Sequence, residues 1–106
     1  MAILKAGEKL LLEERAKSEN YGKGTLTLTS GRLIFERTTG LISKKTEICL
    51  ICPLSTVEDV RVEGLIGKKL AVQGSDERTG RINKWKFSVP NPSGWEMSLK
   101  SAIQSV

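Results

Sequence analysis

The sequence predicts a mainly β domain in which about seven short strands are followed by one C-terminal helix. Three features indicate this fold class: the first three-quarters of the chain reads as short strands, turn-forming clusters separate them, and the period becomes helical after residue 90. The 106 residues, 39% of them hydrophobic, suffice for one modest core, so we expect a single domain over residues 1–106. Because a small open sheet has unpaired edges, we expect it to curl into a barrel that the helix plugs.

The clearest strand signal is a hairpin in the first half of the chain. Residues 24–29 alternate threonine and leucine, which is typical of a half-buried strand. Ser30 and Gly31 form a tight turn, and residues 32–37 provide the returning strand. The other predicted strands span residues 10–16, 46–52, 57–62, 68–73 and 83–89.

The C-terminal segment carries the signals of an amphipathic helix. Asn91 is a suitable N-cap, and Pro92 suits the first helical position. Glu96 and Lys100 are spaced for a favourable ion pair on the exposed face. The apolar residues of this segment fall on one stripe: Trp95, Leu99, Ala102, Ile103 and Val106. We expect this stripe, with Trp95 as its largest member, to plug the open end of the barrel.

The residue types that catalysis and metal binding require are scarce. The chain has no histidine, the commonest general base, and no serine or cysteine lies in a nucleophile motif. Cys49 and Cys52 have CxxC spacing, but zinc would need two further ligands, and residues three apart on a strand point to opposite faces. We therefore expect no enzyme activity, no metal, no other cofactor and no small-molecule substrate. Both cysteines are interpreted as buried apolar residues.

The net charge of +5 favours an anionic partner, although small basic domains without one are as common. Nucleic acid is disfavoured, because Trp85 and Phe87 are needed in the core and cannot stack on bases. A second basic group is interpreted as a solvated strand end beside acidic residues: Arg78, Arg81, Lys84 and Lys86.

Neither a membrane span nor a signal peptide is evident in the sequence. No segment approaches the roughly 20 apolar residues that a spanning helix needs. Residues 1–5 lead directly into a polar segment and lack the apolar core of a signal peptide. We therefore expect a cytoplasmic location, with any membrane contact peripheral and on the inner face.

A short internal repeat is the strongest indication of a binding site. Residues 40–45 and 64–69 are nearly the same hexapeptide, with two bulky apolar residues followed by a pair of lysines. The residues concerned are Leu41, Ile42, Lys44, Lys45, Leu65, Ile66, Lys68 and Lys69. At loop tips, such residues suit contact with a membrane, where leucine and isoleucine enter the headgroup boundary and lysines meet anionic lipid. The alternative is that both apolar pairs only pack onto the barrel.

Four segments, in this order, resemble the PH-like superfamily, and they resemble its GRAM and bacterial PH branches most. These segments are the Gly-Glu opening in residues 4–10, the hairpin in 24–35, the strand junction in 51–57 and the strand-to-helix junction with its tryptophan in 87–95. The hairpin is also similar to that of GLUE domains, a PH-like branch.

The resemblance implies a bent β-barrel of seven strands, arranged as two near-orthogonal antiparallel sheets and capped by one C-terminal α-helix. It also implies binding rather than catalysis, with phosphoinositides, other anionic lipids, peptides or proteins as ligands. Related domains hold lipid headgroups beside the first-to-second strand loop, where this chain offers Lys17 and Lys23. Thr25 and Thr27 stand where phosphoinositide-binding members have arginine, which disfavours stereospecific recognition.

Two functions therefore stay open on the sequence alone. The first is peripheral binding of anionic lipid through the loop tips. The second is a protein-interaction or self-association module without a lipid role. In the second case a peptide, ubiquitin or another partner would bind a strand edge or the groove beside the helix.

Overall fold

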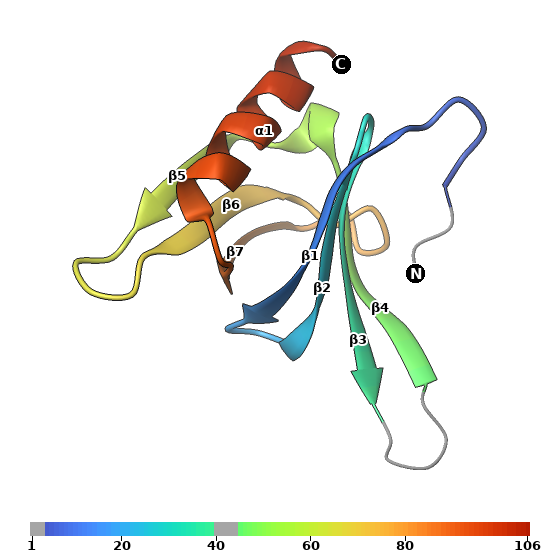
Figure 1. The fold of residues 1–106 in the computed structure, drawn as a ribbon. Helices are drawn as coiled ribbons and strands as arrows, with labels where there is room; N and C mark the ends of the chain where they lie inside the picture. The colour runs from blue at the N-terminus through green and yellow to red at the C-terminus, as the bar shows by residue number, and fades with distance from the viewer. Residues whose placement is uncertain (1–3, 40–44) are drawn as a thin grey trace.

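The computed structural model describes residues 4–39 and 45–106 (Figure 1). Within these residues the chain forms seven strands, one short 3₁₀ turn and one C-terminal helix. In chain order they are β1 (Leu10–Ser18), β2 (Gly22–Thr29), β3 (Arg32–Thr39), β4 (Lys45–Pro53), η1 (Leu54–Thr56), β5 (Asp59–Glu63), β6 (Lys69–Ser75), β7 (Ile82–Ser88) and α1 (Pro92–Gln104). The mainly β class and the C-terminal helix are confirmed.

All the strands belong to one antiparallel sheet, in the order β4-β3-β2-β1-β7-β6-β5. β1 pairs with β2 along its length. It pairs with β7 only through its last two residues, Lys17 and Ser18. The β5–β7 part of the sheet lies across the β1–β4 part, so the sheet is strongly bent (Figure 1).

The described strands do not close the sheet, so the prediction of two separate sheets in a closed barrel differs from the observed pairing. The two halves are continuous because β1 pairs with both β2 and β7. They do not close at the other side because the chain turns away after β4. Pro53 has no N–H to donate, and the Leu54 N–H donates to the Gly31 carbonyl at 2.9 Å as η1 begins.

The observed strand boundaries differ most from the predicted ones at the first hairpin. The sequence predicted strands over residues 10–16 and 24–29, whereas β1 extends to Ser18 and β2 begins at Gly22. The turn is this short because the Ser18 hydroxyl accepts hydrogen bonds from the N–H groups of both Asn20 and Tyr21, at 3.1 and 3.2 Å.

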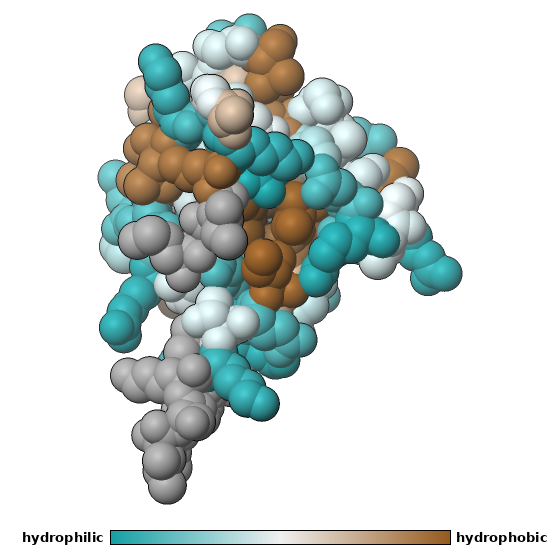
Figure 2. All heavy atoms as spheres, turned by 90° about the vertical axis from the view of Figure 1, so that its right-hand side faces the viewer, coloured by the Kyte–Doolittle hydropathy of each residue, from teal (hydrophilic) through white to brown (hydrophobic). Residues whose placement is uncertain are grey.

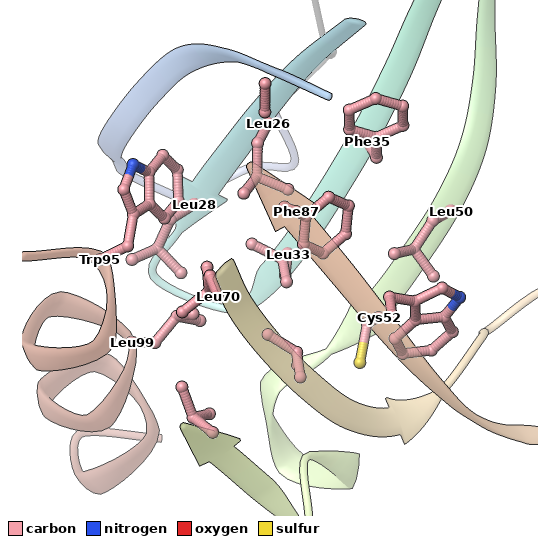
Figure 3. Close-up of a cluster of buried hydrophobic side chains, with 14 of the residues drawn as sticks. Leu26, Leu28, Leu33, Phe35, Leu50, Cys52, Leu70, Phe87, Trp95 and Leu99 are labelled. Atoms are coloured by element: carbon pink, nitrogen blue, oxygen red, sulfur yellow. The ribbon is translucent and has the colours of Figure 1, made fainter. Parts of the chain in front are cut away.

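The core lies on the concave side of the bent sheet, between the strands and the helix (Figure 3). Phe35 and Phe87 pack with their ring centroids 5.5 Å apart and link β3 to β7. The other labelled residues of this cluster come from several strands and the helix: Leu26, Leu28, Leu33, Leu50, Cys52, Leu70, Trp95 and Leu99. On β2 the leucines predicted to face the core, Leu26 and Leu28, are fully buried, but Thr27 and Thr29 are buried as well, so the strand is not half-exposed as predicted.

The helix begins as predicted. The Asn91 side chain accepts a hydrogen bond from the Gly94 N–H at 3.1 Å, and Pro92 is the first helical residue. Trp95, Leu99 and Ala102 are buried against the sheet. Val106 differs from the prediction, because it lies beyond the end of the helix and is exposed.

A buried ion pair anchors the segment that precedes β1. The Arg32 guanidinium donates from Nε and Nη2 to the two carboxylate oxygens of Glu8, at 2.8 and 2.7 Å. The Thr29 hydroxyl donates to Glu8 at 2.7 Å. The hydrogen bond from Arg32 is the main reason that the pKa of Glu8 falls from 4.5 to about 2. The pair fastens residues 5–9 to the β2–β3 turn.

Replacing Trp95 should destabilise the fold severely. The side chain is fully buried, and its Nε1–H donates to Glu14 Oε1 at 2.8 Å. We expect Trp95→Ala to lower the free energy of unfolding by about 3–5 kcal/mol, measured by urea denaturation. Met97→Ala is the matched control on the exposed side of the same helix and should change it by less than about 0.5 kcal/mol. Equal stability of the two variants would show that Trp95 is not the main anchor of the helix.

The Glu8–Arg32 pair should make stability depend on pH. Because the pKa of Glu8 is lower in the folded than in the unfolded chain, its stabilisation is complete above pH 4.5 and is lost as pH falls towards 2. We expect Glu8→Gln to lose about 3 kcal/mol at neutral pH and to be much less sensitive to acid over that range. Glu47→Gln, which breaks an exposed pair with Arg37, is the control. A wild-type acid profile in Glu8→Gln would contradict this assignment.

Candidate functional site

The tip of the β5–β6 hairpin presents two apolar side chains to solvent. Leu65 and Ile66 are 102% and 96% exposed, the highest values among the large hydrophobic residues that the structure describes. They are flanked by Gly64 and Gly67, whose φ angles of +110° and +65° allow the tight turn that projects them. The alternative that Leu65 and Ile66 only pack onto the sheet is therefore wrong.

The second copy of the hexapeptide is mostly outside the described residues. Leu41, Ile42 and Lys44 fall there, so their predicted role at a loop tip stays a prediction. Lys45 is described as the first residue of β4, and it is exposed.

Lys17 and Lys23 lie directly opposite each other on β1 and β2, and both are exposed. Two like charges at facing positions of an antiparallel pair repel each other. A bound anionic group would relieve that repulsion. The structure thus brings together the two lysines that the sequence placed beside the first-to-second strand loop.

The lysines that follow the apolar tip have different environments. Lys68 is exposed, whereas Lys69 donates to Glu19 Oε1 at 2.6 Å. That contact, with its hydrogen bond, is the main cause of the lowered pKa of Glu19. The pair joins the β5–β6 hairpin to the turn between β1 and β2. Lys69 therefore holds the hairpin in place and is less accessible to a ligand than Lys68.

Two of the expected loop tips lie at the same end of the molecule, as the Lys69–Glu19 pair shows. The far end of β3 is also near this turn, because Arg37 Nη1 donates to the Tyr21 carbonyl at 3.5 Å. The turn between β1 and β2 and the β5–β6 hairpin thus lie at the same end of the described sheet (Figure 1).

Three members of the second basic group, Arg78, Lys84 and Lys86, make contacts within the chain. Lys84 and Lys86 approach the two carboxylate oxygens of Glu63 at 2.9 and 3.5 Å, and the hydrogen bond from Lys84 is the main cause of the lowered pKa of Glu63. Arg78 donates to backbone carbonyls of β4. The interpretation of this group as a solvated strand end therefore holds for the exposed Arg81 and Lys84, while Arg78 has a structural role that the sequence analysis missed.

A groove of about 570 Å³ lies between the start of β1 and the helix. On the β1 side the groove is lined by Leu11. Leu11 lies at a β-bulge, where the pairing of β1 with β2 shifts register between Leu10 and Leu12. Its lining combines two exposed apolar side chains with several serines: Leu11, Ser30, Met97, Ser98, Ser101, Ala102 and Ser105. The groove lies beside the helix, where the second functional alternative expected one.

Both cysteines are free, buried and part of the core. The argument that residues three apart face opposite sides of the strand fails here, because the pairing of β4 with β3 shifts register at Cys49. Burial raises the pKa of both thiols, which disfavours the reactive thiolate. Among the described residues no group of three or more potential metal ligands occurs.

Comparison with known proteins adds no assignment to this geometry. No protein-family model matches the sequence, and no curated protein matches it. In the described part of the chain, no helix has both the length and the apolar character needed to cross a membrane.

Proposed function

We propose that this chain is a PH-like, non-catalytic binding module that attaches peripherally to an anionic membrane surface. The observation that carries the proposal is the β5–β6 tip, where Leu65 and Ile66 are almost fully exposed and Lys68 follows. Solvent-facing apolar pairs at a hairpin tip contribute nothing to the core, and their burial in a headgroup layer is favourable.

The fold supports the PH-like part of the proposal. A strongly bent antiparallel sheet with β1 at the junction of its two halves, followed by one C-terminal helix, suits that superfamily. The four sequence segments that resemble it map to the segment before β1, the β2–β3 hairpin, the β4–η1 junction and the β7–α1 junction. The fold alone does not identify the ligand.

The charges around the tip support an anionic surface as the ligand. Lys17, Lys23 and Lys68 are exposed near the same end of the sheet, whereas Lys69 is paired with Glu19. Each exposed lysine contributes about 1 kcal/mol near an anionic bilayer. Together with partial burial of Leu65 and Ile66, the total is about 5–6 kcal/mol, or a dissociation constant on the order of 0.1 mM. Attachment of this strength is reversible and benefits from avidity.

Recognition should depend on surface charge more than on headgroup stereochemistry. Thr25 and Thr27 lie on β2 where arginines would grip a phosphoinositide, and Thr27 is buried with its hydroxyl donating to Glu13. Salt screens such diffuse attraction, so binding should weaken as ionic strength rises. The proposed location is the cytoplasmic face of a membrane.

The test is co-sedimentation with vesicles of phosphatidylcholine alone or with phosphatidylserine added. We expect the wild type to pellet with the anionic vesicles at low salt, and Leu65→Ser/Ile66→Ser to lose most of this binding. Lys17→Glu/Lys23→Glu should also bind less, because the charge of the surface near the tip reverses. Circular dichroism would show that each variant keeps the wild-type fold.

The matched control removes two exposed apolar side chains elsewhere, in Ile82→Ser/Met97→Ser. This variant should bind anionic vesicles as the wild type does, because neither residue lies on the β5–β6 hairpin. Equal loss in the control and in the tip variant would mean that binding follows overall hydrophobicity and would overturn the proposed site. A wild type that never pellets would overturn the lipid function itself.

The second candidate function is protein binding in the groove between β1 and α1. The observation in its favour is the exposed Leu11 and Met97 on the two sides of that groove. A peptide, ubiquitin or a second copy of the chain would then be the partner. Loss of partner capture in Leu11→Ser/Met97→Ser, with vesicle binding absent in the wild type, would favour this function.

A further inference from the structure

One edge of the sheet is formed by β4, which pairs with β3 on one side. On its other side no strand pairs with it among the described residues. Exposed edges of this kind accept strands from other molecules and lead to association or aggregation. A small protein that keeps such an edge needs a way to block it.

The loop between β6 and β7 lies along this edge and donates hydrogen bonds to three of its carbonyl groups. Arg78 Nη1 donates to the Ile48 carbonyl at 2.6 Å, and Nη2 donates to the Cys49 carbonyl. The Glu77 N–H donates to the Ile51 carbonyl at 2.7 Å. Three acceptors of β4 are thereby occupied by groups that belong to a turn and cannot extend the sheet.

The β-bulge of β4 provides the site for the guanidinium. Cys49 is the extra residue, because Phe35 pairs with Leu50 while Glu36 pairs with Ile48. Two consecutive carbonyls, those of Ile48 and Cys49, thus accept from one side chain. The planar fork of arginine matches two neighbouring acceptors, which a single lysine ammonium does not.

The loop holds Arg78 in position through Asp76, which is buried. The Asp76 carboxylate accepts the Arg78 N–H at 3.0 Å, and its other oxygen lies 3.5 Å from Nη2. The Asp76 carbonyl accepts the N–H groups of Thr79 and Gly80. Because these contacts shape the loop, the guanidinium loses little freedom when it binds the edge.

The neighbourhood of the edge makes blocking necessary. Figure 2 views the molecule from the side on which β4 lies in Figure 1, and apolar surface is exposed in the middle of that side. Ile48 on β4 is 38% exposed and Ile82 at the start of β7 is 57% exposed. An uncovered strand edge beside apolar side chains is a site of self-association.

We propose that Arg78 is an edge clamp, which keeps the β4 edge from pairing with a second copy of this chain. The clamp acts at the opposite side of the sheet from β5 and is independent of the proposed membrane function.

The test is the mass of Arg78→Ala in solution as a function of protein concentration, measured by sedimentation equilibrium. We expect the wild type to stay monomeric, and the mass of Arg78→Ala to rise towards that of a dimer or larger species. Arg81→Ala is the matched control, because it removes a basic side chain from the same loop, and it should behave as the wild type. Arg78→Lys keeps the charge without the fork and should associate to an intermediate degree.

A second substitution shows whether association goes through β4. A lysine on an edge strand blocks strand addition, so Arg78→Ala/Ile48→Lys should return to a monomer. If Arg78→Ala is poorly folded, the comparison of Arg78→Lys with Arg78→Lys/Ile48→Lys gives the same answer. The proposal is overturned if folded Arg78 variants stay monomeric at every concentration, or if Ile48→Lys leaves their association unchanged.

Discussion

Two residues at the end of β1 join the halves of this sheet, and the positions of the exposed surfaces depend on them. Lys17 pairs with Ser88 and Ser18 with Phe87, after which the Glu19 N–H donates to the Lys86 carbonyl at 3.1 Å. The buried Ser18 also accepts two N–H groups of the following turn, so the turn is fixed against β7. Because Glu19 then holds Lys69, this junction brings the β5–β6 hairpin to the end of the sheet where Lys17 and Lys23 lie. A shift of register here would separate the apolar tip from these lysines.

Stability and surface chemistry are carried by separate parts of the chain. Trp95 covers the core from the helix, and the Glu8–Arg32 pair fastens the N-terminal segment, both far in sequence from the β5–β6 tip. Leu65 and Ile66 add nothing to the core, so their chemistry can change without unfolding the domain. The ion pairs of Glu63 with Lys84 and Lys86 keep the base of the hairpin polar, which limits the apolar surface to its tip.

Local periodicity predicted what depends on one strand or one helix at a time. The alternation in residues 24–29 correctly placed Leu26 and Leu28 in the core, and the repeated hexapeptide correctly singled out Leu65 and Ile66 as unusual. Contacts between residues that are far apart in the sequence leave no periodic pattern in it. Nothing in the sequence marks Lys69 as the partner of Glu19, and a β-bulge such as that at Cys49 has no signature of its own. The continuity of the sheet through Lys17 and Ser18 was missed for the same reason.

The protection of the two edge strands of the sheet helps to interpret the exposed β5–β6 tip. At the β5 edge, α1 packs against the strand (Figure 1). An ion pair between Asp59 and Arg61 keeps the solvent side of the strand charged. At the β4 edge, the β6–β7 loop occupies the carbonyls of the strand. Both edges of the described sheet are thus protected by local chemistry. Such protection would be expected to extend to a hairpin tip, where a polar residue costs nothing. Leu65 and Ile66 depart from that rule further than any other large hydrophobic residue that the structure describes, and a binding surface explains the departure better than the needs of folding do.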